Sequence, residues 1–181
     1  EPDKVLTELN RLVKLTLRQE SQSLSKDGMD IAFCSFNKKT NRLLYAGANR
    51  PLYITNTKGL LEFKATKASV GGYVPLIQAY ELNEVVLEKD STIVLSSDGY
   101  ADQFGGANEK KFSTKAFKSL LQNIAHKTKK EKKVEIRQSL TLTFSNLESA
   151  TAPVVVGIYG TSNKFPDPKD QLKEYKFKPK G

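Results

Sequence analysis

The sequence contains no tryptophan, one cysteine, one histidine and one methionine in 181 residues. A single cysteine excludes an internal disulfide, and its position in DIAFCSF predicts that Cys34 occupies a buried strand rather than a redox site. A zinc site needs further ligands that the surroundings of His126 do not supply, so we interpret His126 as a surface residue. The chain also lacks the apolar run of about 18 residues that a membrane span requires.

No signal-peptide pattern is present, and the sequence starts at Glu1 without a methionine. We therefore expect a cytoplasmic domain excised from a longer protein. With 38% hydrophobic and 27% charged residues, the composition is typical of a soluble globular protein, and the length suits one domain with a substantial core. We place that domain at residues 1–160 and a basic C-terminal tail at residues 161–181.

The formal net charge of +9 raises nucleic acid, anionic lipid and acidic proteins as binding partners. Most of the excess lies in HKTKKEKKVEIR, at residues 126–137, and in the tail. Neither segment interleaves the aromatic residues or glycines of a nucleic-acid-reading motif, and runs of charge are usually solvated faces or tails. We therefore expect no nucleic-acid partner and keep a basic binding surface as an alternative.

Hydrophobic periodicity predicts an α+β protein whose helices cover antiparallel sheets. An amphipathic helix is expected near the N-terminus, with Val5, Leu9, Leu12 and Val13 as its apolar stripe. The strands are expected at residues 29–37, 42–49, 51–56, 60–64, 80–88, 91–97 and 153–160. The first four are predicted to form a meander, and the next two a pair around Lys89 and Asp90.

Two helices are expected between the last strands. The second runs over about residues 130–144, and the first carries apolar residues at helical spacing, namely Ala116, Phe117, Leu120, Leu121 and Ile124. Ser113 is the predicted N-cap of the first. We expect Met29 and the aromatic residues to lie in the core, because they follow strand or helix periodicity. Tyr100 either packs or faces an open cleft.

Asp98 is the residue through which the sequence most directly suggests chemistry. The segment LSSDGYADQFGG follows an apolar strand with the pair Asp98–Gly99. A carboxylate held at a strand end suits a hard cation, and the glycine leaves room above it. The same pair also forms turns, and one aspartate cannot build a metal site. Spacing alone leaves both interpretations open.

Other polar residues have a structural and a functional interpretation. Asp27 and Asp30 could be paired acids, but they flank a strand start, where we favour a structural role. Asn49 and Arg50 stand at a hairpin tip; a guanidinium matches phosphate geometry, although a loop arginine is often only solvated.

A glycine-containing turn is the remaining candidate. Ser69, Gly71 and Gly72 either form a loop that faces a substrate or serve backbone geometry alone.

Five segments together resemble one known family. They are DGMDIAFCSFNKKTNRLLYAGANRPLYI, SVGG, TIVLSSDGYADQFGG, KKFSTKAFKSLLQNI and LESATAPVVVGIYG. In order and spacing they resemble the SpoIIE-like branch of the metal-dependent protein phosphatases, the PPM superfamily. The resemblance covers residues 1–160, and AGANRPLY and SDGYADQFGG are its most distinctive parts.

The resemblance implies an α-β-β-α sandwich of antiparallel sheets flanked by helices, with two Mg²⁺ or Mn²⁺ ions at one edge. In such a site the ions activate a water and neutralise charge on a phosphoserine or phosphothreonine. It also implies that Asp98 matches a family metal ligand. We expect the sandwich to lack its first strands, and an exposed apolar edge would then favour a homodimer.

Two departures from the family pattern concern the metal. The family's Asp followed by a Gly-His-Gly turn is absent, and Thr151 and Ala152 stand where relatives carry two consecutive acids. A hydroxyl and a methyl group cannot replace carboxylate charge beside a divalent cation. Asp98 is therefore the one matched ligand, and we do not expect a complete Mn²⁺ or Mg²⁺ pair to bind.

Five further residues are predicted to line the site. Asp102 is expected to be a hydrogen-bonding partner in the turn after Asp98; the others are Gly99, Asn49, Arg50 and Gly71.

Three functional hypotheses follow. The first is a SpoIIE-like signalling domain that is non-catalytic, a pseudophosphatase that binds a phosphoprotein or a regulatory protein. The second is an active phosphatase for phosphoserine and phosphothreonine, completed by an upstream segment. The third is a basic surface that binds anionic lipid or nucleic acid in a strongly salt-dependent way.

Overall fold

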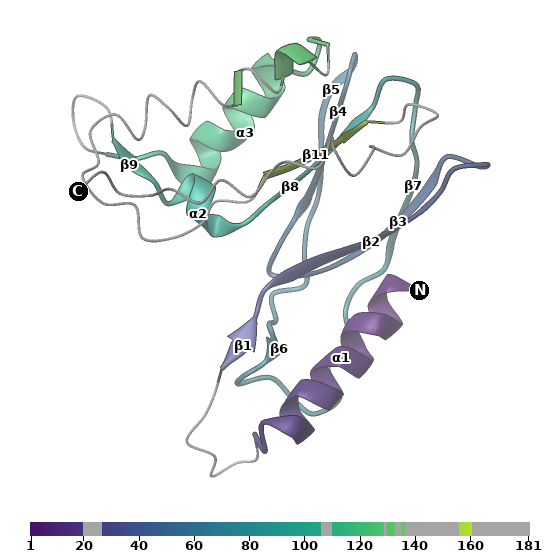
Figure 1. Cartoon of the computed structure of the whole chain (residues 1–181), viewed down its shortest axis with the longest axis vertical. Coiled ribbons are helices and arrows are strands. Elements are labelled where there is room, and N and C mark those ends of the chain that lie inside the picture. The colour runs from purple at the N-terminus through teal and green to yellow at the C-terminus, as the bar shows by residue number, and fades with distance from the viewer. Residues whose placement is uncertain (20–26, 106–109, 129, 133–134, 137–155, 161–181) are drawn as a thin grey trace, which may run out of the picture. The chain divides into compact units, whose positions relative to one another are not determined.

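The computed structural model describes residues 1–19, 27–105, 110–128, 130–132, 135–136 and 156–160 (Figure 1). The described residues form two compact units. Unit 1 comprises Glu1–Leu52 and Glu62–Glu88; unit 2 comprises Tyr53–Leu61 and the chain from Lys89 onward. The α+β class with antiparallel sheets that the sequence predicts is confirmed.

Unit 1 is built on a three-stranded antiparallel sheet in the order β2 (Ile31–Asn37), β3 (Arg42–Ala48) and β7 (Asn83–Val86). The predicted hairpin is confirmed, since β2 and β3 pair from Ile31 opposite Ala48 to Asn37 opposite Arg42. Asn37 Oδ1 accepts a hydrogen bond of 2.9 Å from the backbone N–H of Lys39 and so closes the turn. A second, two-stranded sheet joins β1 (Gly28–Met29) to β6 (Val70–Gly71).

Helix α1 (Pro2–Thr16) lies beside β3 and β6 in unit 1, as Figure 1 shows. The helix is confirmed, but its predicted apolar stripe is partly wrong, because the side chains of Val5 and Leu12 are 42% and 46% exposed. Its buried side chains are instead Pro2, Leu6, Asn10 and Lys14. The buried face of α1 therefore includes two polar residues, Asn10 and Lys14, whose side chains have hydrogen-bond partners within unit 1.

Unit 2 contains a four-stranded sheet in the order β11 (Val156–Gly160), β8 (Thr92–Ser96), β4 (Leu52–Asn56) and β5 (Gly59–Phe63). Helix α3 (Ser113–Asn123) contributes Phe117 and Leu121 to its core. The rings of Phe117 and Tyr53 meet edge to face at 5.6 Å. Ser113 was predicted to be the N-cap, but it is the first residue of α3 and Phe112 precedes it as the N-cap; Ser113 Oγ accepts a hydrogen bond of 3.3 Å from the backbone N–H of Ala116.

The remaining elements of unit 2 are the one-turn helix α2 (Asp98–Ala101) and the pair β9 (Phe104–Gly105) and β10 (Lys110–Lys111). Residues 130–132 and 135–136 are helical; the rest of the helix predicted up to residue 144 lies outside the described residues. The same applies to the basic tail at residues 161–181.

The predicted four-strand meander is wrong as a whole, although β2 neighbours β3 and β4 neighbours β5 as it requires. Strand β4 does not follow β3 in one sheet but pairs with β8, with Tyr53 opposite Val94. The chain turns between the two strands at Asn49, whose φ is 55°, and Pro51 has no N–H to donate to a ladder. The predicted pairing of β7 with β8 is also wrong, because β7 pairs with β3.

Among the described residues, the prediction that Met29 and all aromatic residues lie in the core is wrong for four side chains. Phe33 is 36%, Met29 43%, Phe104 54% and Tyr73 87% exposed. Met29 and Phe104 belong to two-residue strands, which are too short to be covered on both faces, and Tyr73 lies in the loop after β6. Within the described part of the chain, no helix is long and apolar enough to cross a membrane.

Candidate functional site

Asp98 is the first residue of α2, two positions after β8 ends at Ser96. Its side chain is exposed, and its backbone carbonyl accepts a hydrogen bond of 2.9 Å from the N–H of Asp102. A carboxylate in the first turn of a helix is favourably placed beside the unpaired N–H groups there. The Asp-Gly pair thus starts a helical turn, which the sequence analysis did not predict.

The turn after Asp98 is closed by contacts within unit 2. Asp102 Oδ1 lies 2.9 Å from Lys111 Nζ, and both side chains are about half exposed. The side chain of Gln103 donates a hydrogen bond of 2.7 Å to the carbonyl of Gly99. Asp102, the second acid of the segment, therefore forms an ion pair with Lys111.

Tyr100 packs rather than facing an open cleft, which decides between its two interpretations. Its side chain is 2% exposed, and its ring lies 4.7 Å from that of Phe117 and 5.6 Å from that of Phe112. Its hydroxyl donates a hydrogen bond of 3.3 Å to the carbonyl of Ile136. Tyr100 therefore fixes α2 to the core of unit 2.

In unit 1, Asp30, Asn49 and Arg50 come together. Asp30 Oδ1 accepts a hydrogen bond of 2.9 Å from Asn49 Nδ2, and its Oδ2 lies 2.5 Å from an Arg50 guanidinium nitrogen. The side chains of Arg50 and Asp30 are only 19% and 30% exposed. Arg50 is thus a half-buried, oriented cation rather than a fully solvated loop arginine.

Gly47 contributes to this loop in a way that the sequence analysis missed. The hydroxyl of Tyr45 donates a hydrogen bond of 2.6 Å to the carbonyl of Arg50. That hydroxyl occupies the space where a Cβ on Gly47 would stand. A glycine inside a strand often marks such a close approach, and this was the available signal.

Gly71 and Gly72 lie in a turn held by α1. Their φ values are 79° and 73°, a region that glycine adopts without strain. The N–H of Gly71 donates to Asn10 Oδ1 at 2.8 Å, and the carbonyl of Gly72 accepts from Lys14 Nζ at 2.9 Å. Both glycines are buried, so the role that the structure shows for them is to form this turn in unit 1.

The polar clamp on this turn was not anticipated from the sequence. Asn10, Lys14 and Gln19 are at most 9% exposed, and Asn10 also donates to the carbonyls of Pro75 and Leu76, each at 3.0 Å. The side chain of Gln19 accepts a hydrogen bond from the N–H of Gly72 and donates one to the carbonyl of Asp27. The spacing of Asn10 and Lys14 by four residues was the signal, since such residues share a helix face.

The described residues do not supply a metal centre. Among them, no three His, Cys, Asp or Glu side chains are grouped so that they could hold an ion. Asp98 and Gly99 lie in unit 2, with Asp102 engaged by Lys111, and Asn49, Arg50 and Gly71 lie in unit 1. Thr151 and Ala152 lie outside the described residues. The donors present in the described part therefore do not fit a pair of divalent ions.

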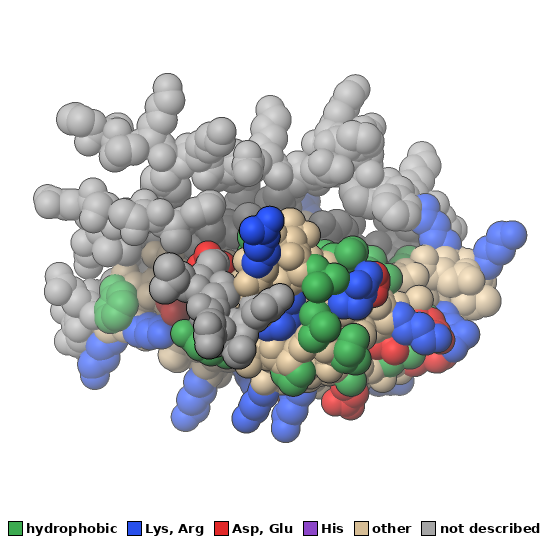
Figure 2. Space-filling model, turned by 90° about the horizontal axis from the view of Figure 1, so that it is seen from below, with side chains coloured by type: hydrophobic (Ala, Val, Ile, Leu, Met, Phe, Trp, Pro, Cys, Tyr) green, Lys and Arg blue, Asp and Glu red, His purple; other side chains and the backbone are tan. Residues whose placement is uncertain are grey.

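Two further titratable residues that the sequence analysis singled out are Cys34 and His126. Burial raises the pKa of the Cys34 thiol to about 11, so this half-buried cysteine is a poor nucleophile near neutral pH. His126 is exposed, as predicted. Among the described residues on the face in Figure 2, Lys and Arg side chains occur at several places, with Asp and Glu side chains among them.

Comparison with solved structures identifies the class of fold. The chain superimposes on the SiaA-PP2C domain of Pseudomonas aeruginosa with a TM-score of 0.67 and 23% identity, covering 81% of this chain and 55% of that domain. It superimposes on the phosphatase domain of the cell fate determinant SpoIIE from Bacillus subtilis with a TM-score of 0.57 and 11% identity, covering 91% of this chain and 75% of that one. The fold is that of PP2C-type phosphatase domains.

The family follows from the sequence itself. Residues 1–149 match the family model of Stage II sporulation protein E (SpoIIE), so the chain belongs to the SpoIIE family. A search among curated proteins gives no match. The chain spans about half the length of the SiaA-PP2C domain, at 55%, and the likeness to these structures concerns the fold alone.

Proposed function

We propose that this chain is a SpoIIE-family signalling domain that binds a phosphoprotein or a regulatory protein without hydrolysing phosphate. The proposal rests chiefly on one sequence observation, the pair Thr151–Ala152, which stands where the family that the sequence resembles carries two consecutive acids. Carboxylates are needed there to offset the charge of divalent ions, and neither side chain carries one.

The strand register makes this pair relevant to Asp98. Strand β11 starts at Val156, which is paired with Ser96 at the end of β8. The chain therefore enters β11 at the same end of the sheet at which β8 leads to Asp98. Acids a few residues before Val156 would be within the reach of one site with Asp98, and Thr151 and Ala152 supply none.

The alternative is an active Mn²⁺- or Mg²⁺-dependent phosphatase for phosphoserine and phosphothreonine, completed by a segment upstream of Glu1. The relation to PP2C-type domains supports it, and a structure of the Bacillus subtilis domain presoaked in Mn is among the similar structures, with a TM-score of 0.56. Under this alternative, water or another carboxylate would replace the missing acids.

An Mn²⁺ titration by calorimetry, together with phosphate release from a phosphoserine peptide, tests the proposal. The measurement uses a protein extended upstream of Glu1, because the alternative requires that segment. The extended protein should still release no phosphate at saturating Mn²⁺ and should not bind two ions tightly. Tight binding of two ions that Asp98→Asn abolishes would overturn it in favour of the active enzyme.

A gain-of-charge variant makes the same test specific. Thr151→Asp combined with Ala152→Asp should strengthen Mn²⁺ binding by at least about tenfold, because it restores two carboxylates. The matched control, Thr161→Asp with Ser162→Asp, adds the same charge in the tail and should leave Mn²⁺ binding unchanged. If both variants changed Mn²⁺ binding equally, carboxylates at residues 151 and 152 would have no special effect, and the proposal would lose its support.

The finer expectations are proposals of the same kind. We propose a cytoplasmic location, a bacterial origin, a functional unit within residues 1–160 and self-association into a homodimer. Light scattering at high protein concentration tests the last: a strictly monomeric mass would contradict it. Binding of anionic lipid or nucleic acid is the third candidate, and it requires an affinity that falls steeply with salt.

A further inference from the structure

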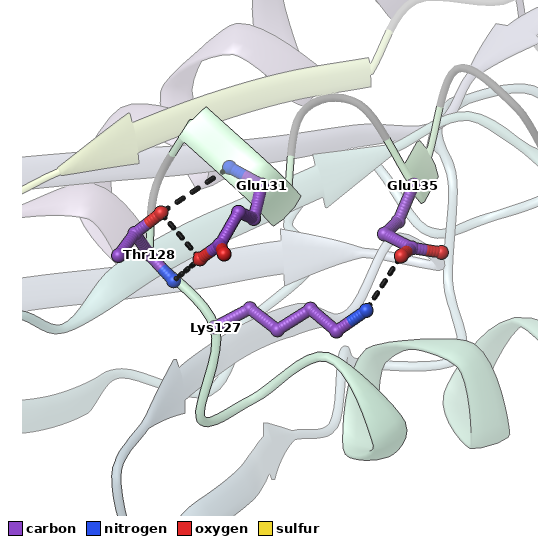
Figure 3. Close-up of polar contacts among 4 residues, drawn as sticks. All are labelled: Lys127, Thr128, Glu131 and Glu135. Atoms are coloured by element: carbon purple, nitrogen blue, oxygen red, sulfur yellow. Dashed lines mark hydrogen bonds and ion pairs between the residues drawn. The ribbon is translucent and has the colours of Figure 1, made fainter.

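The described residues of the basic run after α3 belong to unit 2, and side-chain contacts hold the first of them in place. We call its described residues, 127–128, 130–132 and 135–136, the strap. Thr128 and Glu131 form a capping box: Glu131 Oε2 accepts hydrogen bonds from the backbone N–H of Thr128 at 2.8 Å and from its hydroxyl at 2.6 Å. Lys127 Nζ lies 2.5 Å from Glu135 Oε1 (Figure 3). These contacts hold the strap in a helical turn.

Lys132 points inward from the strap, although it belongs to a run that looked fully solvated in the sequence. It is 3% exposed, and its Nζ donates hydrogen bonds to Thr55 Oγ1 at 3.1 Å and Thr92 Oγ1 at 3.5 Å. Thr55 and Thr92 face each other across β4 and β8. The lysine therefore joins the strap to both central strands of the sheet through neutral hydroxyls.

Ile136 is the second inward residue, one helical turn after Lys132. Its side chain is 3% exposed and belongs to the same core cluster as Tyr100 and Phe117. Its carbonyl accepts the hydrogen bond of 3.3 Å from the Tyr100 hydroxyl. The strap thus contacts α2 directly, at a residue two positions after Asp98.

We propose that the strap is a conformational latch for α2. Its docking through Lys132 and Ile136 holds Tyr100, and Tyr100 holds the turn that begins at Asp98. Helix α2 comprises only Asp98–Ala101, and a single turn is not stable on its own, so its conformation depends on such tertiary contacts. Release of the strap loosens the segment that carries the family's one matched ligand.

Docking of the strap has an energetic cost, because Lys132 buries an amine. Burial lowers the pKa of Lys132, while the carboxylate of Asp90 opposes this shift. An ammonium group whose hydrogen bonds go to two hydroxyl groups loses much of its hydration free energy on burial, and the Asp90 carboxylate offsets only part of this loss. A partner that offers a carboxylate or phosphate to Lys132 would therefore favour the undocked strap.

Hydrogen exchange in the whole chain tests the latch. Lys132→Asp should undock the strap and raise exchange of the Asp102 amide, which is bonded to the Asp98 carbonyl, by about tenfold. Lys130→Asp makes the same charge change at an exposed position of the strap and should have no such effect. Faster exchange of residues 130–136 with unchanged exchange at Asp102 would overturn the proposal.

A second variant keeps the test decisive if Lys132→Asp unfolds unit 2. Tyr100→Phe keeps the ring against Phe112 and Phe117 and removes only the hydroxyl that reaches Ile136. It should raise exchange both at Asp102 and at residues 130–136, while strand β2 of unit 1 keeps its protection. Unchanged exchange at both places would show that the strap and α2 are independent.

Discussion

The hydroxyl of Tyr45 donates a hydrogen bond of 2.6 Å to the backbone carbonyl of Arg50, passing over Gly47. This contact fixes the backbone after β3, while Asp30 fixes the Arg50 side chain. The loop that the sequence suggested as a phosphate contact is therefore held at two points. Its rigidity depends on the absence of a side chain at residue 47.

Gly47→Ala should destabilise the protein by about 2–4 kcal/mol, because the new Cβ would stand 2.5 Å from the Arg50 carbonyl oxygen and closer still to the Tyr45 hydroxyl oxygen, and the hydrogen bond between these two groups would be lost. Urea denaturation measures the loss. Gly28→Ala, where a Cβ would meet its nearest neighbour at 3.1 Å, is the milder control. Tyr45→Phe should recover part of the loss in the Gly47→Ala background; purely additive effects would contradict the proposed steric coupling.

Asn10→Ala should cost about 3 kcal/mol of unfolding free energy. The substitution leaves the N–H of Gly71 and the carbonyls of Pro75 and Leu76 without their buried partner. The neighbouring Arg11 is the control: Arg11→Ala removes only a surface ion pair with Glu8 and should cost less than about 1 kcal/mol. Equal midpoints in urea for the two variants would contradict a structural role of the clamp.

The ion pair of Arg50 with Asp30 should matter more than that of Arg42 with Glu84. The first is 19% and 30% exposed, the second 52% and 46%, so water screens the first less. Asp30→Asn should therefore lower the unfolding free energy by about 1–2 kcal/mol, and Glu84→Gln by less than about 0.5 kcal/mol. Thermal denaturation of both variants measures the two losses of stability. A larger loss of unfolding free energy for Glu84→Gln than for Asp30→Asn would contradict the argument.

Lys132→Met should stabilise unit 2 by about 1–2 kcal/mol at neutral pH, since it keeps the buried stem and removes a desolvated charge. The pH dependence has a definite sign. The pKa of Lys132 is lowered in the folded protein, so its destabilising effect is fully present below that pKa and is relieved as pH rises toward the unfolded value of about 10.5. The native chain should gain stability in that alkaline range relative to Lys132→Met; parallel pH profiles would contradict a buried charged amine.

Local patterns predicted most elements of this fold, but not their partners. The hairpin of β2 with β3 follows from alternation and a polar turn, both of which are local. The separation of β4 from β3 depends on the left-handed backbone at Asn49, which no hydrophobic pattern records. The inner face of α1 was misplaced for a related reason: buried Asn10 is stabilised by distant carbonyls, which periodicity cannot detect.

The candidate site shows the same division. The sequence located the end of β8 and the Asp-Gly pair, but not the helical turn that starts at Asp98, because one turn is too short for a periodic signal. Lys132 looked like part of a solvated basic run, since its burial depends on two threonines from other strands. Contacts between distant segments, rather than composition, decide both cases.

The position of β11 at the border of its sheet has a practical consequence for anyone shortening this protein. A fragment that stops before Val156 would turn β8 into the outermost strand, with the backbone of Thr92–Ser96 unpaired along that side. An edge strand with unpaired backbone groups can pair with strands of other molecules, which leads to aggregation. Expression of such a fragment should yield insoluble material, whereas one that retains Gly160 should stay in solution.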